Sequence, residues 1–319
     1  MAEQSVSTPS YLRSWLKALR PHQWAKNALV FAPLALAGVQ ATFGDIKMAL
    51  LGFVALGIAS SVGYVVNDLL DVEADRAHPN KRRRPFASGA LPVWVGYVTV
   101  PLGIVVAAAI TATLPELFAK AIAVYFAGTL LYSFLLKRMP PFDLVALGGL
   151  FTVRVLAGMA FVPPPISLWF LTFAMFMFIG LAAVKRYAEL LRLDRETSAL
   201  ASSASSLGST TGLGVAPARL DRGYDTSNLA FVMVLGVGCG IAAVQIFIMY
   251  LMLDRFPARI YGNPVALWFM APAILAWLMR VWLLASRGEM DEDPIAFALR
   301  DRQSWALGAA CAFLIFLAW

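Results

Sequence analysis

Long apolar runs, each about the length of a membrane-crossing helix, recur along the whole chain. A crossing helix needs about 20 predominantly apolar residues. Such runs lie near 27–44, 48–66, 91–113, 121–136, 142–162, 166–184, 229–252, 261–279 and 303–319. The stretch 155–184 carries no charge, and we divide it at Pro163-Pro164-Pro165 because three prolines cannot continue a helix. The pattern predicts an all-α integral membrane protein with nine transmembrane helices.

The basic residues support this count and predict an orientation. Of the 26 Lys and Arg, 21 precede the first run or lie in alternate connections, four lie in the opposite connections, and Arg154 falls within a run. Cytoplasmic loops of membrane proteins are enriched in Lys and Arg. We therefore expect a cytoplasmic N-terminus, an external C-terminus and charged chemistry on the cytoplasmic face.

The same pattern predicts one membrane domain with a short leading segment. Residues 1–26 read as a cytoplasmic or interfacial segment, in which Tyr11–Arg20 could form an amphipathic helix. Residues 27–319 read as the nine-helix catalytic domain. The one long cytoplasmic loop is expected at 185–228, and its Ser/Gly-rich middle, 197–214, is expected to be mobile.

Composition narrows the functional classes. Hydrophobic residues make up 60% of the 319 positions and charged residues 14%, against roughly 45–50% and about 25% in soluble domains. This excludes a soluble enzyme, a disordered chain and a nucleic-acid-binding module, despite the net charge of +7. The two cysteines, Cys239 and Cys311, both lie in apolar runs, so a disulfide framework or a zinc site is not expected.

An acidic cluster follows the second run. On a continuous helix, Asn67, Asp68, Asp71 and Asp75 fall within an arc of roughly 100°, whereas Glu73 points away. Carboxylates this close repel one another unless a cation lies between them, and hard oxygen ligands suit Mg²⁺. The alternative is a solvated helix end that is merely rich in acids.

A basic run follows directly, in the stretch from His78 to Pro85. Alone it would be read as a topology signal. Beside an acidic face, it also provides counter-charge for a phosphorylated ligand. Together the two stretches predict a magnesium–diphosphate site.

The stretch from Asn67 to Asp75 resembles the first acidic motif, N-D-x-x-D-x-x-x-D, of the UbiA superfamily of intramembrane prenyltransferases. That family's helical bundle of nine spans, with its active site open to the cytoplasm, agrees with the predicted count. Further stretches resemble the subgroup that transfers phosphoribosyl groups to decaprenyl phosphate. They are Arg20–Asn27, Asn67–Pro85, Tyr132–Arg138, Arg154–Gly158 and Lys185–Leu190.

One departure from the family pattern bears on the substrate. Aromatic prenyltransferases of the superfamily carry a second Asp-rich motif where this chain reads Lys185-Arg186-Tyr187-Ala188-Glu189. Cations at the place of a magnesium carboxylate should still bind polyphosphate, but differently. Together with the resemblance, this favours a phosphoribosyl donor over an isoprenyl diphosphate donor.

The resemblance implies a magnesium-dependent transfer from 5-phosphoribosyl 1-diphosphate to a polyprenyl phosphate, typically decaprenyl phosphate. It places the enzyme in the cell membrane (inner or plasma membrane) and its product in arabinogalactan precursor synthesis for the cell wall, and it leaves a homo-oligomer open. The expected metal ligands are Asn67, Asp68, Asp71 and Asp75, and the three aspartates are also the expected catalytic residues. The expected substrate-binding residues are Lys26 (with His22 beside it), Tyr64, Lys81, Arg84, Tyr132, Lys137, Arg138, Arg154, Lys185 and Arg186.

Arg154 is the one cation inside a predicted span. A charge at that depth is costly unless it faces a cavity or a partner. We expect it to line the pocket near Tyr64 and Tyr132. The alternative is a structural pair with Asp143 or a helix-end carbonyl.

Two other functions remain as alternatives. A UbiA-type enzyme could move an isoprenyl chain onto an aromatic acceptor in a quinone or haem pathway. A transporter would be expected to carry its ionisable groups near the bilayer midplane, whereas here they gather at one surface. A second acidic cluster, Asp291-Glu292-Asp293, precedes Pro294 and is read as a solvated loop.

Overall fold

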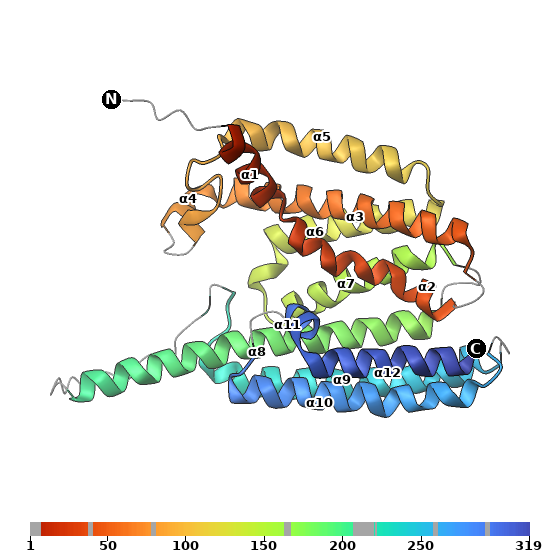
Figure 1. Cartoon of the computed structure of the whole chain (residues 1–319). Helices are drawn as coiled ribbons and strands as arrows, with labels where there is room; N and C mark the ends of the chain where they lie inside the picture. The colour runs from red at the N-terminus through yellow and green to blue at the C-terminus, as the bar shows by residue number, and fades with distance from the viewer. Residues whose placement is uncertain are drawn as a thin grey trace, which may run out of the picture. The chain divides into compact units, whose positions relative to one another are not determined.

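The protein is an all-helical, multi-pass membrane protein (Figure 1). The computed structural model describes residues 8–37, 41–77, 81–162, 167–206, 220, 222–257, 261–290 and 294–319. Seven helical stretches in these ranges are long and apolar enough to cross a membrane: Phe43–Leu70, Val93–Thr111, Glu116–Phe134, Phe142–Met159, Leu168–Ser202, Thr226–Arg255 and Pro264–Arg287.

The chain folds into two compact units. The first comprises Met1–Ser133 and Val153–Pro165, and the second comprises Phe134–Thr152 and Ile166–Trp319. Helix α7 (Phe142–Met159) contributes its beginning to the second unit and its end to the first.

Helix α3 (Phe43–Leu70) is the most deeply packed helix of the first unit. A capping box begins it: the Thr42 hydroxyl accepts the amide hydrogen of Asp45, and the Asp45 carboxylate accepts that of Thr42. At Gly57, a Cβ would lie 2.5 Å from the ring of Trp24, so the missing side chain lets the two segments approach closely. The other elements are α1 (Thr8–Leu19), η1 (Pro21–Phe31), α2 (Ala32–Ala37), α4 (Val72–Ala77), η3 (Lys81–Arg83), α5 (Val93–Thr111) and α6 (Glu116–Phe134).

Helix α1 confirms the helix expected near Tyr11–Arg20. Ala18 is buried in an apolar cluster with Val65 and Phe86, and the Trp15 indole donates a hydrogen bond to the Thr99 hydroxyl (3.1 Å). On another side of the helix, Leu12 and Leu16 remain exposed. This two-sided arrangement suits a helix that lies at a membrane surface, which stays a prediction.

In the second unit, helix α8 (Leu168–Ser206) packs along α9 (Leu229–Tyr250) and α10 (Met270–Arg287). At Gly236 of α9, a Cβ would lie 2.3 Å from Trp282 of α10 and 2.7 Å from Ala183 of α8, so the three helices meet at this glycine. The other elements are η4 (Leu136–Arg138), η5 (Thr226–Asn228), the π-helical η6 (Leu251–Arg255), η7 (Pro264–Phe269), α11 (Pro294–Arg300) and α12 (Arg302–Ala318).

The nine predicted runs all fall on helical segments, but two of these segments are short. The first run corresponds to η1 followed by α2, and the ninth to α12, which has 17 residues. Nine crossings therefore stay a prediction. The division near Pro163 agrees with the helices, because α7 ends at Met159 and α8 begins at Leu168.

The long loop expected at 185–228 is wrong over its first half. Residues 185–206 continue helix α8, which runs past the ends of α9 and α10 in Figure 1. At 1.5 Å per residue, its 39 residues span about 58 Å. The sequence 185–202 contains neither Gly nor Pro, so nothing stops the helix where the apolar run ends. Three expectations lie wholly or partly outside the described residues: they concern residues 207–214 of the Ser/Gly stretch, residues 78–80, and the acidic residues 291–293.

Candidate functional site

The acidic motif lies where α3 passes into α4. The structure interrupts the helix at Asp71 (φ −96°, ψ 8°), so the continuous helix expected from Asn67 to Asp75 is wrong. Hydrogen bonds nevertheless cross the interruption: the Asp71 amide donates to the Asn67 carbonyl (3.0 Å), and the Asp75 amide donates to the Asp71 carbonyl (2.8 Å). Because these hydrogen bonds keep the helical spacing of four residues across the interruption, Asp68 and Asp75 still lie on the same side of the two helices.

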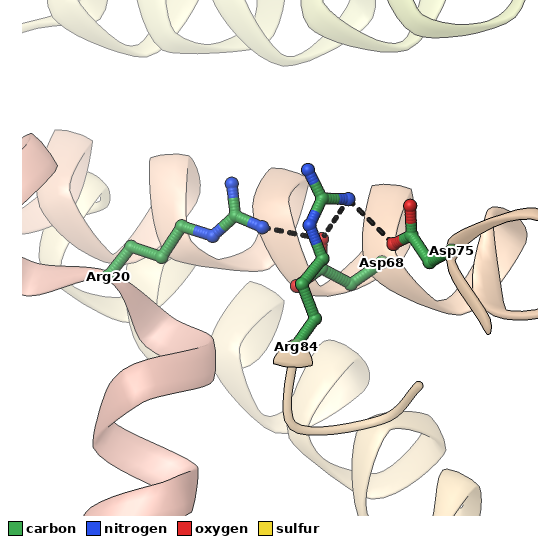
Figure 2. A network of polar contacts seen from close by, with 4 residues as sticks. All are labelled: Arg20, Asp68, Asp75 and Arg84. Carbon is green, nitrogen blue, oxygen red and sulfur yellow. Dashed lines mark hydrogen bonds and ion pairs between the residues drawn. The ribbon is translucent and has the colours of Figure 1, made fainter. Parts of the chain in front are cut away.

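Two arginines hold this acidic pair (Figure 2). Arg84 Nη1 lies 2.7 Å from Asp75 Oδ2 and 3.3 Å from Asp68 Oδ1. Arg20 Nη2 lies 2.6 Å from Asp68 Oδ1. Both carboxylates are buried, with side chains 2–3% exposed, whereas Arg20 and Arg84 are 23% and 28% exposed. The acids are therefore fixed within the helices, and the cations reach them from the accessible side.

The local backbone positions each of the two arginines beside the acids. Arg20 is the first residue after α1, and its left-handed conformation (φ 51°) turns the chain towards η1. Its guanidinium lies 5.0 Å from the ring centre of Tyr64 on α3, in cation–π geometry. Arg84 follows η3, where its amide donates to the Lys81 carbonyl (2.9 Å) and its carbonyl accepts from the Ser88 amide (2.8 Å).

The acidic pair also has an unfilled acceptor. Asp68 Oδ2 is buried and has no hydrogen-bond partner among the residues that the structure describes. Within the described ranges, no three carboxylate, imidazole or thiol side chains converge as a metal site would require. Mg²⁺, however, is commonly held by one or two carboxylates together with water and substrate phosphates. The pair Asp68 and Asp75 fits that donor set, with Asn67 and Asp71 beside it, half-buried at the helix junction.

A second ionic cluster lies in the second unit, at the K-R-Y-A-E stretch. Arg186, 1% exposed, donates to the buried carboxylate of Asp143 (2.8 Å) and also pairs with Glu189. The Tyr224 hydroxyl donates to the other Asp143 oxygen (2.7 Å), and the tyrosine ring lies under the guanidinium. Arg186 was predicted to bind phosphate, but its guanidinium is committed to two carboxylates.

The remaining predicted residues lie on several elements. Tyr64 lies on α3, Lys26 on η1, Lys81 begins η3, and Tyr132 lies on α6; all four are half-buried and belong to the first unit. His22, also on η1, is exposed. Lys137 and Arg138 form η4 and Lys185 lies on α8, all in the second unit.

Arg154 lies in a buried polar cluster. Its Nε donates to Asn27 Oδ1 (2.9 Å), and its Nη2 donates to the Tyr125 hydroxyl (3.0 Å). Ser60 completes the cluster through the Tyr125 hydroxyl (3.0 Å) and the Asn27 amide (3.3 Å). The alternative pair with Asp143 does not match these contacts, since Asp143 is held by Arg186 and Tyr224.

Several participants were not among the predicted site residues. Arg20 and Asn27 are the first and last residues of the R-P-H-Q-W-A-K-N stretch, so the sequence did carry a signal for them. Tyr125 and Tyr224 carried none, because one tyrosine within an apolar run and one in a connection match no motif of the sequence.

Residues 28–308 match the UbiA prenyltransferase family. The uncharacterized protein y4nM of Sinorhizobium fredii is 35% identical over 94% of this chain, which spans only 55% of that protein's length. Nodulation protein NoeC of Azorhizobium caulinodans is 32% identical over 95% of this chain and 93% of its own length. Decaprenyl-phosphate phosphoribosyltransferase of Mycobacterium tuberculosis is 38% identical over 66% of this chain and 72% of its own length.

Solved structures share the fold at low sequence identity. A UbiA homologue from Archaeoglobus fulgidus, bound to DMAPP and Mg²⁺, superposes with a TM-score of 0.63 at 15% identity, over 96% of this chain and 97% of that one. A digeranylgeranylglyceryl phosphate synthase superposes with a TM-score of 0.64 at 16% identity, over 97% and 98%. Fold, acidic motif and sequence matches agree: this chain belongs to the UbiA prenyltransferase family.

Proposed function

We propose that the protein transfers the 5-phosphoribosyl group from 5-phosphoribosyl 1-diphosphate to a polyprenyl phosphate, such as decaprenyl phosphate, and releases diphosphate. The family assignment supports group transfer in a membrane. Relatives named decaprenyl-phosphate phosphoribosyltransferase, 38% identical over two thirds of the chain, support this donor and acceptor. Such a product would serve arabinan-donor synthesis for the cell wall, at the cytoplasmic face of the cell membrane.

The observation that carries the choice of donor is the Asp143–Arg186–Glu189 cluster. Both carboxylates near the second motif position are paired with one buried guanidinium. A prenyltransferase with two Asp-rich motifs would need carboxylates at that position for a second metal. Here the acids neutralise an internal cation instead, which favours a site with one acidic motif.

The reaction needs charge stabilisation more than proton transfer. The C1–O bond to diphosphate breaks with its electron pair leaving on diphosphate, while an oxygen of the acceptor phosphate bonds to C1. A phosphate monoester has a second pKa of about 6, so this nucleophile is already ionised at neutral pH and no general base is required. The residues have to position two anions and stabilise a third as it departs.

The acidic pair and its arginines can meet that demand. Asp68 and Asp75, with Asn67 and Asp71 beside them, would hold Mg²⁺, which supplies positive charge to the departing diphosphate. Arg20 and Arg84 lie at the accessible side of the two acids. A guanidinium group there can bind two phosphate oxygens at once. Lys26 and Lys81 of the same unit stay candidate phosphate ligands, as do Lys137, Arg138 and Lys185 of the second unit, each taken by itself.

The experiment is a labelled-lipid assay on purified protein. Donor carrying a radiolabelled ribose is incubated with decaprenyl phosphate and Mg²⁺, and the lipid extract is separated by chromatography. We expect label in a polar lipid, loss of that product with chelator, and a fall of at least about a hundredfold in Asp75→Asn, which removes one charge of the metal pair. Glu73→Gln, an exposed acid two residues away on the same helix, is the matched control and should keep activity.

Prenyl transfer onto an aromatic acceptor is the second candidate, because the family name and the DMAPP-bound structure both concern prenyl donors. The same preparation is therefore given labelled geranyl diphosphate and 4-hydroxybenzoate. If this assay yields prenylated 4-hydroxybenzoate and the first assay yields no labelled polyprenyl lipid, prenyl transfer becomes the supported function.

A further inference from the structure

We propose that the Arg84 guanidinium is a substitute cation: it joins Asp68 and Asp75 in the metal-free protein, and it leaves both carboxylates to the incoming metal ion and turns to the phosphates of the donor. This inference rests on the proposed function for its metal and its diphosphate.

One nitrogen makes both contacts. Figure 2 shows two dashed lines from the same Arg84 nitrogen, one to each carboxylate, and the distances are 2.7 Å to Asp75 and 3.3 Å to Asp68. Arg84 bridges two acids on separate helices, α3 and α4, and so supplies the positive charge between them that a divalent ion would supply. Without it, two buried carboxylates would repel each other across a medium of low dielectric constant.

The arginine is more accessible than the acids that it joins. Asp68 and Asp75 are buried on helices, whereas the Arg84 side chain is 28% exposed and extends from a turn. The Arg84 backbone is held on both sides, by the Lys81 carbonyl and the Ser88 amide. Its guanidinium can therefore swing through side-chain torsions alone. Asp68 Oδ2, buried and without a partner in the described part of the chain, is an acceptor that the arginine does not use.

The exchange would add one positive charge beside the two carboxylates, and the negative charge of the diphosphate would offset it. Asp68 and Asp75 would hold the divalent ion in place of the Arg84 guanidinium, and the guanidinium would then pair with the diphosphate that binds with the ion. Arginine suits this second role because its planar donors match phosphate oxygens. Metal and diphosphate should consequently assist each other's binding, since each favours the same position of Arg84.

The test compares Arg84→Gln with Arg82→Gln, an exposed arginine of the same turn, as matched control. Binding of Mn²⁺ to the purified, detergent-solubilised full chain is measured without any anion, from the loss of the free-ion electron paramagnetic resonance signal. Removing the competing cation should tighten Mn²⁺ binding about fivefold or more in Arg84→Gln and leave it unchanged in Arg82→Gln. Asp68→Asn should abolish this binding and so locate the ion.

The second arm measures labelled inorganic pyrophosphate by equilibrium dialysis at a fixed free Mg²⁺ concentration. Arg84→Gln should bind pyrophosphate at least about tenfold more weakly than wild type, although it binds the metal more tightly. A purely structural bridge would make both ligands bind more weakly, and that result overturns the inference. If Arg84→Gln does not fold, Arg84→Met is measured instead; methionine is a long side chain without a charge, so the same opposite shifts support the inference and parallel losses overturn it.

These measurements do not depend on which group is transferred. If the wild-type protein makes labelled polyprenyl lipid but Arg84→Gln does not bind Mn²⁺ more tightly, this inference is wrong and the proposed function stands. Opposite shifts in the two binding arms, in a protein that transfers only prenyl groups, leave this inference standing and remove the proposed function.

Discussion

In the second unit, three side chains neutralise and hydrogen-bond one another in the buried interior. Arg186 and Asp143 are both almost fully buried, and Tyr224 satisfies the carboxylate oxygen that Arg186 leaves. Removing one partner from a buried ion pair leaves the other charge uncompensated, which costs more than the pair contributes. The cluster is therefore a point of high sensitivity in the unit.

Graded substitutions in this cluster should show that sensitivity. Tyr224→Phe should lower the free energy of unfolding by about 1–3 kcal/mol, because an acceptor on a buried carboxylate loses its hydrogen bond. Asp143→Asn should cost about 3–5 kcal/mol, since Arg186 then keeps only Glu189. Thermal unfolding in detergent measures both against Tyr97→Phe, an exposed tyrosine of α5. Equal melting temperatures for Tyr224→Phe and Tyr97→Phe would contradict the assigned role of Tyr224.

At this scale the sequence predicted residue types better than partners. Asp68 and Asp75 were placed on one face from their spacing, and the structure brings them together through Arg84. The partners of Arg154 could not be predicted, because Asn27 and Tyr125 are 127 and 29 positions away along the chain. Periodicity reports a face of a helix but not what the other helices present to it.

Among the elements, close approach at glycine positions holds the helices together. At Gly158, near the end of α7, a Cβ would lie 2.1 Å from the backbone carbonyl oxygen of Val30 on η1. Backbone cannot rotate aside as a flexible side chain can. The apolar pattern predicted where helices occur, whereas this packing depends on how two of them cross, which no single run encodes.

Two glycine substitutions should therefore have opposite effects. Gly158→Ala should destabilise the protein by about 1–3 kcal/mol or more, because the methyl group has no room. Gly238→Ala on α9 meets no atom of the described residues within 4 Å and should be neutral or stabilising by up to about 1 kcal/mol through helix propensity. Melting temperatures in one detergent compare the two variants directly. A Gly158→Ala protein as stable as Gly238→Ala would disprove the close contact.

For the whole molecule, the apolar pattern predicted the helical class and the order of the helices. It could not predict that α8 continues to Ser206, because a polar sequence after an apolar run is compatible with either a loop or a helix that has left the membrane. The nine crossings and their orientation depend on the lipid environment and stay predictions.

Cysteine labelling in intact cells tests the predicted orientation. In a background lacking Cys239 and Cys311, a cysteine replacing Ser202 on the α8 extension should be shielded from an impermeant maleimide until the cells are lysed. A cysteine replacing Thr113, exposed between α5 and α6, should react in intact cells because that connection is predicted to be external. Labelling of both residues from the same side would contradict an odd number of crossings between them.

Arg20 is separated from α1 by a single peptide bond, and its left-handed backbone directs its guanidinium to Asp68. The N-terminal 20 residues precede every predicted crossing, so a shortened expression clone could omit them as a mere leader. Such a truncation would strip one of two counter-charges from a buried carboxylate. A shortened enzyme that fails to bind metal normally would then report a missing arginine, not a missing membrane anchor.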